Sequence, residues 1–381
     1  MSDHPYRNAP DTAFWERSVV REFTPAAVPK RPDTPFGPTD RFMSAGSCFA
    51  SNVRRYLEAG GFDYTVTEGP HPMWPESAEA PYYEAFSARY GNIYTVRQMV
   101  QLIQRAQGTF RPVEEFWVDG ETLIDPFRPG LLHRARSVDE FRALTAQHLR
   151  AVLRAITEST VFVFTLGLTE AWVSSADGAV FPACPGTVAG TFDPARHAFV
   201  NFDANEVRTD LVKMVDLMRS INPSLRIVLT VSPVPLVATA TDQHVLTATT
   251  YSKAVLRVAA EEAVRLRPDV HYFPAFELVT ASQDPGGAFE ADLRSVREPV
   301  VASVMDAFFT SLCAGGISRP SGPGDSGRTS ATADAARLRL IATSAIEAEC
   351  EEMMMDELRP RQKPETRRAG SFDERVGDLD L

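Results

Sequence analysis

The sequence predicts an α/β fold in which a parallel sheet is covered by helices on both faces. Two segments, residues 160–166 (TVFVFTL) and 225–231 (LRIVLTV), are continuous runs rich in β-branched and aromatic residues. Such runs are typical of strands that are buried on both faces of a sheet. Segments with helical periodicity alternate with these and other short apolar runs, which indicates parallel strands joined by right-handed crossovers. We therefore expect a three-layer αβα architecture.

The other elements follow the same alternation. A first strand at residues 41–46 (RFMSAG) stops at a glycine, and a helix over residues 49–59 follows it and ends at Gly60 and Gly61. Apolar residues recur at helical spacing in that segment, and glycine is a common helix stop. A loop-rich stretch is expected over residues 108–136. Further helices are expected over residues 95–107, 137–155, 205–220, 252–266 and 298–313, and a further strand over residues 269–274.

The 381 residues divide into one main domain, residues 39–313, and three flanking segments. Residues 1–38 are rich in proline and are expected to form an arm that packs on the main domain. Residues 314–333 are rich in Gly, Ser and Pro, which is typical of a flexible linker. The last segment, residues 334–381, begins with an apolar-striped helix that packs on the core or binds a protein partner. Its charged end is expected to be disordered.

Composition excludes several classes of protein. The formal net charge of −11 argues against binding to nucleic acid or to an anionic membrane surface, because like charges repel. The sequence has no run of 18 apolar residues and no apolar leader segment, so we expect neither a membrane span nor a signal peptide. The four cysteines are far apart, without a CxxC pair, which disfavours a zinc site and a disulfide framework. These observations together predict a cytoplasmic protein.

Polar side chains follow the predicted strands at the point where each strand ends. Ser47 and Cys48 follow the first strand, and Gly167, Thr169 and Glu170 follow the strand at 160–166. In an open α/β sheet, ligands bind at the carboxyl ends of the strands, so these side chains are expected to lie along one edge. A loop rich in hydroxyl residues follows the strand at 225–231 and contains Asp242 and His244, and the last strand is followed by Glu277 and Asp292. A serine, a histidine and several acids on one edge suit acyl transfer by an activated serine.

Ser47 lies where a helix is expected to begin. Free backbone N–H groups and the positive end of the helix dipole can stabilise the oxyanion that forms when a serine attacks a carbonyl. A serine at this place also suits a simple N-cap. Cys48 is a rival nucleophile, since a helix N-terminus lowers the pKa of a thiol in general, although free cysteines are more often buried and inert.

Six segments carry a resemblance to a known family. Residues 46–50 spell GSCFA, and this chain resembles the bacterial GSCFA domain family, which is related to the SGNH hydrolases. The resemblance covers roughly residues 40–312 and implies a flavodoxin-like αβα fold and ester chemistry without a metal or an organic cofactor. The other matching segments are YGNIYT at 90–95, VFTLGLTEAW at 163–172, TVSPVPL at 230–236, YSKAVLR at 251–257 and YFPAFE at 272–277.

The resemblance implies roles for single residues. Ser47 matches the nucleophile of the first SGNH block. Gly91 is the counterpart of the glycine whose N–H binds the oxyanion, and Asn92 beside it is a further side-chain donor. Residues 167–170 (GLTE) match the third block, Gly-x-Asn-Asp, so Thr169 stands where the family has an asparagine. A hydroxyl would then replace an amide in the oxyanion hole.

The fourth block departs from the family pattern Asp-x-x-His. Asp292 is present, but Ser295 stands where the histidine is expected. His244 is the best substitute as the catalytic base, because it follows a strand on the same edge. Its orienting acid is then Asp292, Glu277 or Asp242, of which Asp292 matches the family position.

The sequence therefore predicts a serine esterase or O-acyltransferase that acts on an acylated small molecule or glycan, with a carbohydrate ester as the favoured class. Two alternatives stay open. The departures at Thr169 and Ser295 favour a binding module for glycans or proteins on the same fold, and Cys48 allows a thiol-based role. Five aromatic residues are candidates for stacking on a sugar, although packing is the simpler role for each: Trp74, Tyr82, Tyr83, Trp117 and Trp172.

Overall fold

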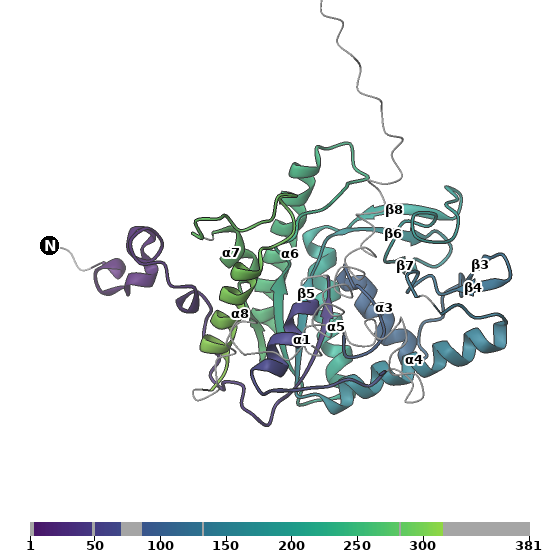
Figure 1. Cartoon of the computed structure of the whole chain (residues 1–381), viewed down its shortest axis with the longest axis horizontal. Helices are drawn as coiled ribbons and strands as arrows, with labels where there is room; N and C mark the ends of the chain where they lie inside the picture. The colour runs from purple at the N-terminus through teal and green to yellow at the C-terminus, as the bar shows by residue number, and fades with distance from the viewer. Residues whose placement is uncertain (1–3, 48–49, 70–85, 132, 282, 315–381) are drawn as a thin grey trace, which may run out of the picture.

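The computed structural model describes residues 4–47, 50–69, 86–131, 133–281 and 283–314. Its centre is a five-stranded sheet in which all neighbouring strands are parallel, in the order β10-β9-β5-β1-β2 (Figure 1). This is the strand order of flavodoxin-like folds, and it confirms the predicted fold class. The strands of this sheet are β1 (Arg41–Gly46), β2 (Asp63–Tyr64), β5 (Val161–Leu166), β9 (Arg226–Val231) and β10 (Val270–Tyr272).

Helices cover both faces of the sheet and enclose two separate cores. Leu57 and Phe308 belong to one core, and Met99 and Leu256 belong to the other. The helices over the first core are α1 (Ala50–Ala59), α7 (Ala275–Thr280) and α8 (Glu298–Leu312). The helices over the second core are α3 (Val96–Ala106), α4 (Val138–Glu158), α5 (Ala204–Ile221) and α6 (Val245–Leu266). The three layers expected from the sequence are therefore present.

The alternation of side chains along β5 explains why its sequence is apolar without a break. Successive side chains of a strand point to opposite faces. Phe162 and Phe164 pack in the core under α3–α6, whereas Val161 and Val163 pack in the core under α1, α7 and α8. Both faces of β5 are therefore shielded from water, as the sequence pattern predicted.

Side-chain caps set the starts of the long helices. The side chain of Thr95 accepts a hydrogen bond from the first turn of α3, and Ser137 and Asp203 do the same for α4 and α5. Each such cap satisfies a backbone N–H that has no partner within the helix. The start of α6 is the largest boundary difference from the sequence prediction. His244 caps it, so the helix begins at Val245, seven residues before the expected start.

A smaller antiparallel part of the fold was not predicted. A hairpin of β3 (Trp117–Asp119) and β4 (Thr122–Ile124) lies within the stretch expected to be loops. A three-stranded sheet in the order β7-β6-β8 consists of β6 (Glu170–Ser174), β7 (Val180–Phe181) and β8 (His197–Asn201). Strands of two to five residues leave too little alternation to detect. In Figure 1 both lie on the side of the central sheet away from the N-terminal arm.

The N-terminal arm contacts the main domain from Val19 onward, where the Val19 carbonyl accepts a bond from the Gln283 side chain. Its short helical turns are η1 (Pro5–Asn8), η2 (Asp11–Ala13), η3 (Glu16–Arg21) and η4 (Pro25–Ala27). The turn η4 packs against α8, and Phe36 is fully buried, with its N–H bonded to the Leu312 carbonyl at 2.9 Å. Trp15 lies closer to the N-terminus of the arm and is 72% exposed. The predicted linker beyond Ala314 and the predicted tail helix lie outside the described residues.

Candidate active site

A close approach between β1 and β5 determines the position of Ser47. Gly46 ends β1 with a φ of +140°, and a Cβ on it would lie 2.3 Å from the Thr165 carbonyl oxygen. Only glycine fits there, because any other side chain would collide with the backbone of β5. Ser47 follows at the carboxyl edge of the sheet, and its carbonyl accepts a bond of 2.8 Å from the N–H of Ala50 at the start of α1.

The hydroxyl of Ser47 is buried, and it has no hydrogen-bond partner among the described residues. A buried hydroxyl without a partner costs about 1–3 kcal/mol. A catalytic role or an ordered water molecule accounts for such a group in a folded protein. The rival nucleophile, Cys48, lies outside the described residues.

Three loops from different parts of the chain meet at Ser47. The Ile93 N–H donates to the Gly46 carbonyl at 2.9 Å. The next carbonyl, that of Tyr94, accepts bonds from two successive amides after β5, at 3.1 Å from Gly167 and 3.0 Å from the residue that follows it. A Cβ on Gly167 would lie 3.3 Å from the Ser47 Cβ. The turns at 91–94 and 167–169, which the resemblance assigned to the oxyanion hole, are thus both beside the serine.

The donors predicted from the third block already have partners within the protein. The Thr169 hydroxyl donates to the Asn201 side chain at 2.6 Å, and the Thr169 N–H donates to the Ser252 hydroxyl at 3.0 Å. Gly91 has a φ of +67° with open space around its Cα, and the Asn92 carbonyl accepts a bond from a side-chain amide of α3.

The predicted base and acid are engaged in local contacts. The imidazole Nδ1 of His244 accepts a bond from the Leu246 N–H at 3.2 Å, and this side chain is exposed. Asp292 accepts a bond of 2.6 Å from the hydroxyl of Ser295, the residue predicted to replace a histidine. In the described part of the chain, no hydrogen bond joins His244 to Ser47 or to Asp292. The triad of Ser47, His244 and Asp292 therefore stays a prediction.

The two other candidate acids, Glu277 and Asp242, form no hydrogen bond or ion pair with Ser47 or His244 in the described structure. Glu277 on α7 accepts bonds from Arg257 Nε at 2.9 Å and from the Tyr272 hydroxyl at 2.8 Å. Burial, and then the charge of Glu277, raises the pKa of Tyr272 well above its usual value. Asp242 is exposed. Glu277 thus contributes to an ion pair at the β10 edge of the sheet.

Lys253 is a residue that the sequence analysis did not single out. Its side chain is 3% exposed, and its Nζ donates to the Gly167 carbonyl at 2.7 Å. It comes from α6, where Leu256 and Ala260 are fully buried, three and seven residues further along the same helix. A lysine on the apolar face of an amphipathic helix was the signal available in the sequence.

A cavity of about 200 Å³ opens beside the turns at 91–94 and 167–169. Tyr94 and Leu168, the neighbours of the Ser47 site, form part of its wall. Glu170 also lines it, and its carboxylate accepts bonds from the Thr239 hydroxyl at 2.7 Å and from a backbone N–H at 3.2 Å. The apolar wall includes Trp172, Phe199 and Leu236. Of the five aromatic candidates, Trp172 lines this cavity, while Trp74, Tyr82 and Tyr83 lie outside the described residues.

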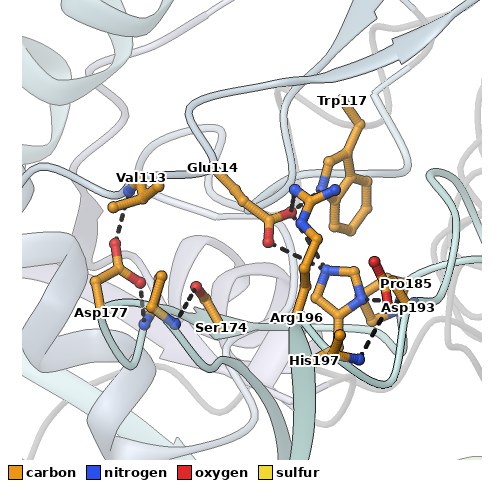
Figure 2. Close-up of polar contacts among 12 residues, drawn as sticks. Val113, Glu114, Trp117, Ser174, Asp177, Pro185, Asp193, Arg196 and His197 are labelled. Atoms are coloured by element: carbon orange, nitrogen blue, oxygen red, sulfur yellow. Dashed lines mark hydrogen bonds and ion pairs between the residues drawn. The ribbon is translucent and has the colours of Figure 1, made fainter.

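The fifth aromatic candidate, Trp117, belongs to a buried polar cluster in the antiparallel part of the fold. Figure 2 shows Glu114 at its centre, with Trp117, Arg196 and His197 directed toward the carboxylate. The Trp117 indole N–H donates at 3.0 Å, the Arg196 guanidinium lies at 3.0 Å, and His197 Nε2 lies at 3.2 Å. His197 Nδ1 accepts from the Asp193 N–H, so Nε2 is the nitrogen that donates to Glu114. This cluster fixes β3 and β8 relative to each other.

A second buried ionic cluster supports the loop that leads to Gly91. Burial alone would raise the pKa of Glu68, but contacts with His148 and Arg128 and a bond from the Arg89 N–H lower it to about 2. His148 Nδ1 lies 2.7 Å from the Glu68 carboxylate, and the Arg128 guanidinium lies 2.7 Å from Asp125. Glu68 therefore stays ionised while it holds residues 89 and 148 together.

The described ranges offer neither a metal site nor a membrane span. Within them, no group of three or more His, Cys, Asp or Glu side chains has an arrangement that suits a metal ion. The same ranges contain no helix that combines the length and the apolar character needed to cross a bilayer.

The fold and the Ser47 turn define a three-layer αβα protein with a serine at the carboxyl end of its first sheet strand. Residues 41–308 match the GSCFA family, and the chain belongs to that family. A search of the curated proteins found no match.

The chain is also similar to solved structures at low identity. A family 3 carbohydrate esterase from Clostridium thermocellum is 9% identical, with a TM-score of 0.32. A carbohydrate esterase family 3 structure from Talaromyces cellulolyticus is 10% identical, with a TM-score of 0.33. A mutant acetyl esterase with an acetate ion is 10% identical, with a TM-score of 0.32. Each similarity covers 71% of this chain and 94% of the other.

Proposed function

We propose that this protein carries out serine-dependent ester chemistry, as an esterase or an O-acyltransferase. The observation that supports this proposal most is the Ser47 hydroxyl, which is buried and has no hydrogen-bond partner in the described structure. The two turns that pack around Ser47 contain Tyr94 and Leu168, which line a cavity. A nucleophile needs such a position, because the scissile carbonyl must reach it while water is held back. Membership of the GSCFA family agrees with this class of reaction.

In the proposed reaction, Ser47 Oγ attacks the acyl carbonyl and loses its proton to a base. The ester C–O bond breaks, the proton passes to the leaving alcohol, and the acyl group stays on Ser47. Water in an esterase, or a second alcohol in a transferase, then removes the acyl group. His244 with Asp292 remains the predicted source of the base, and His244 must then give up its bond to the Leu246 N–H.

The cavity suits an acylated substrate with an apolar or ring-shaped part. Trp172 and Phe199 supply aromatic surface, and the Glu170 carboxylate supplies an acceptor for hydroxyl groups. An acylated carbohydrate combines these features, since sugars stack on aromatic faces and donate hydroxyl bonds. This is the substrate class that we favour.

The test is turnover of p-nitrophenyl acetate together with labelling by a fluorophosphonate probe. Wild type should show both signals, Ser47→Ala neither, and Cys48→Ala both. Loss of both signals in His244→Ala would support the predicted base. If Ser47→Ala keeps turnover, Cys48→Ala loses it, and iodoacetamide at mild pH labels Cys48 fast, the thiol alternative replaces the serine mechanism.

A binding module on the same fold is the second candidate. The internal contacts of Thr169 and Asp292 favour it, because both groups are already satisfied within the protein. This candidate predicts no turnover and no labelling in wild type, together with glycan binding that Trp172→Ala weakens.

A further inference from the structure

A buried lysine side chain bonds to the turn that packs on the proposed nucleophile, and it has no role in the reaction as described so far. Lys253 is 3% exposed, and its Nζ donates to the Gly167 carbonyl at 2.7 Å. Gly167 in turn packs against the Ser47 side chain, since a Cβ on it would lie 3.3 Å from the Ser47 Cβ. Gly167 therefore contacts both Ser47 and Lys253.

The predicted donors that follow β5 are engaged in bonds within the protein. After β5, the Gly167 N–H donates to the Tyr94 carbonyl, and the Thr169 N–H donates to Ser252. The Thr169 hydroxyl, in the position of the family asparagine, donates to Asn201. These groups cannot also stabilise a negative charge at Ser47 without breaking bonds within the protein. A positive charge close to the turn can stabilise an oxyanion without a hydrogen bond from a backbone N–H.

We propose that Lys253 is the electrostatic and positioning residue of the Ser47 site. It holds the turn through the Gly167 carbonyl, and its positive charge stabilises the negative charge that develops on the acyl oxygen during attack by Ser47. This inference rests on the proposed function. Lys253 takes no part in the proton and acyl transfers, which are those already written. Its effect is strong because the low polarity of a buried site screens charges weakly.

Three substitutions at one position separate charge from packing. Lys253→Arg keeps a charge and a donor, Lys253→Gln keeps a donor to the Gly167 carbonyl without the charge, and Lys253→Met has neither. The control is Lys213→Met on α5, where the lysine is exposed. The readouts are kcat and KM for p-nitrophenyl acetate, the rate of fluorophosphonate labelling, and circular dichroism to verify folding.

We expect Lys253→Met and Lys253→Gln each to lower kcat and the labelling rate about 100-fold, with KM changed less than threefold. Lys253→Arg should stay within about tenfold of wild type, and Lys213→Met should be unchanged. A kcat within threefold of wild type for folded Lys253→Met overturns the inference. A kcat and a labelling rate close to wild type in Lys253→Gln also overturn the inference, because a neutral donor to the Gly167 carbonyl would then suffice. If Ser47→Ala keeps turnover and labelling, the proposed function itself has failed, whatever the Lys253 variants do.

Discussion

Gly167→Ala is the perturbation whose effect follows most directly from the geometry of the site. The added Cβ would lie 2.9 Å from the Tyr94 carbonyl oxygen and 3.3 Å from the Ser47 Cβ. The first contact is with backbone, which cannot rotate away. The Tyr94 segment must therefore move, although its carbonyl accepts the bonds from Gly167 and from the next amide.

The magnitude combines two terms. Overpacking a tightly packed site by one methyl group costs about 1–3 kcal/mol. Weakening one of the two bonds to the Tyr94 carbonyl adds about 0.5–1.5 kcal/mol. We expect Gly167→Ala to lower the free energy of unfolding by about 2–4 kcal/mol. A displacement of Ser47 by about 1 Å should also reduce turnover about 100-fold, because the attack geometry is narrow.

The assay is urea unfolding followed by circular dichroism, with p-nitrophenyl acetate turnover measured on the same preparations. Gly37→Ala is the matched control, because a Cβ on Gly37 meets no atom within 4 Å. It should change the free energy of unfolding by less than about 1 kcal/mol. Equal stability and equal turnover in Gly167→Ala and Gly37→Ala would refute the reasoning that the turn is closely packed on Ser47.

Three other perturbations address the rest of the molecule. Glu68→Gln should lower stability at pH 7 by about 1–3 kcal/mol, because the variant loses charge-assisted bonds to His148 and to the Arg89 N–H. The folded pKa of Glu68 lies below its usual value, so in wild type this contribution is lost as pH falls from about 4.5 to 2. Acid unfolding curves should show that loss flattened in the variant. Glu114→Gln leaves His197 without its carboxylate and should cost about 1–3 kcal/mol in urea unfolding, with turnover within threefold of wild type. Trp172→Ala should raise KM for aromatic esters about tenfold with little change in kcat, and an unchanged KM would exclude the cavity as the substrate site.

Part of the candidate site could be predicted from the sequence because its residues follow strands. Ser47, Gly167 and the turn at Gly91 each come directly after or before an element with a clear apolar pattern, and the structure brings these three turns together. The partners of single groups could not be predicted. The Thr169 hydroxyl bonds to Asn201, which lies 32 residues away in a strand too short to detect. Lys253 was missed because it lies within a helix and not at a strand end.

The sequence by itself determined the layered αβα fold and the place of Ser47. Continuous apolar runs need burial on both faces, and the apolar run of the first strand ends at a glycine directly before Ser47. Only the tertiary structure decided which polar groups surround that serine. Hydrogen bonds such as Thr169 to Asn201 and Lys253 to Gly167 join residues 32 and 86 positions apart. Their formation depends on how separate elements pack, and no local pattern of residues encodes that packing.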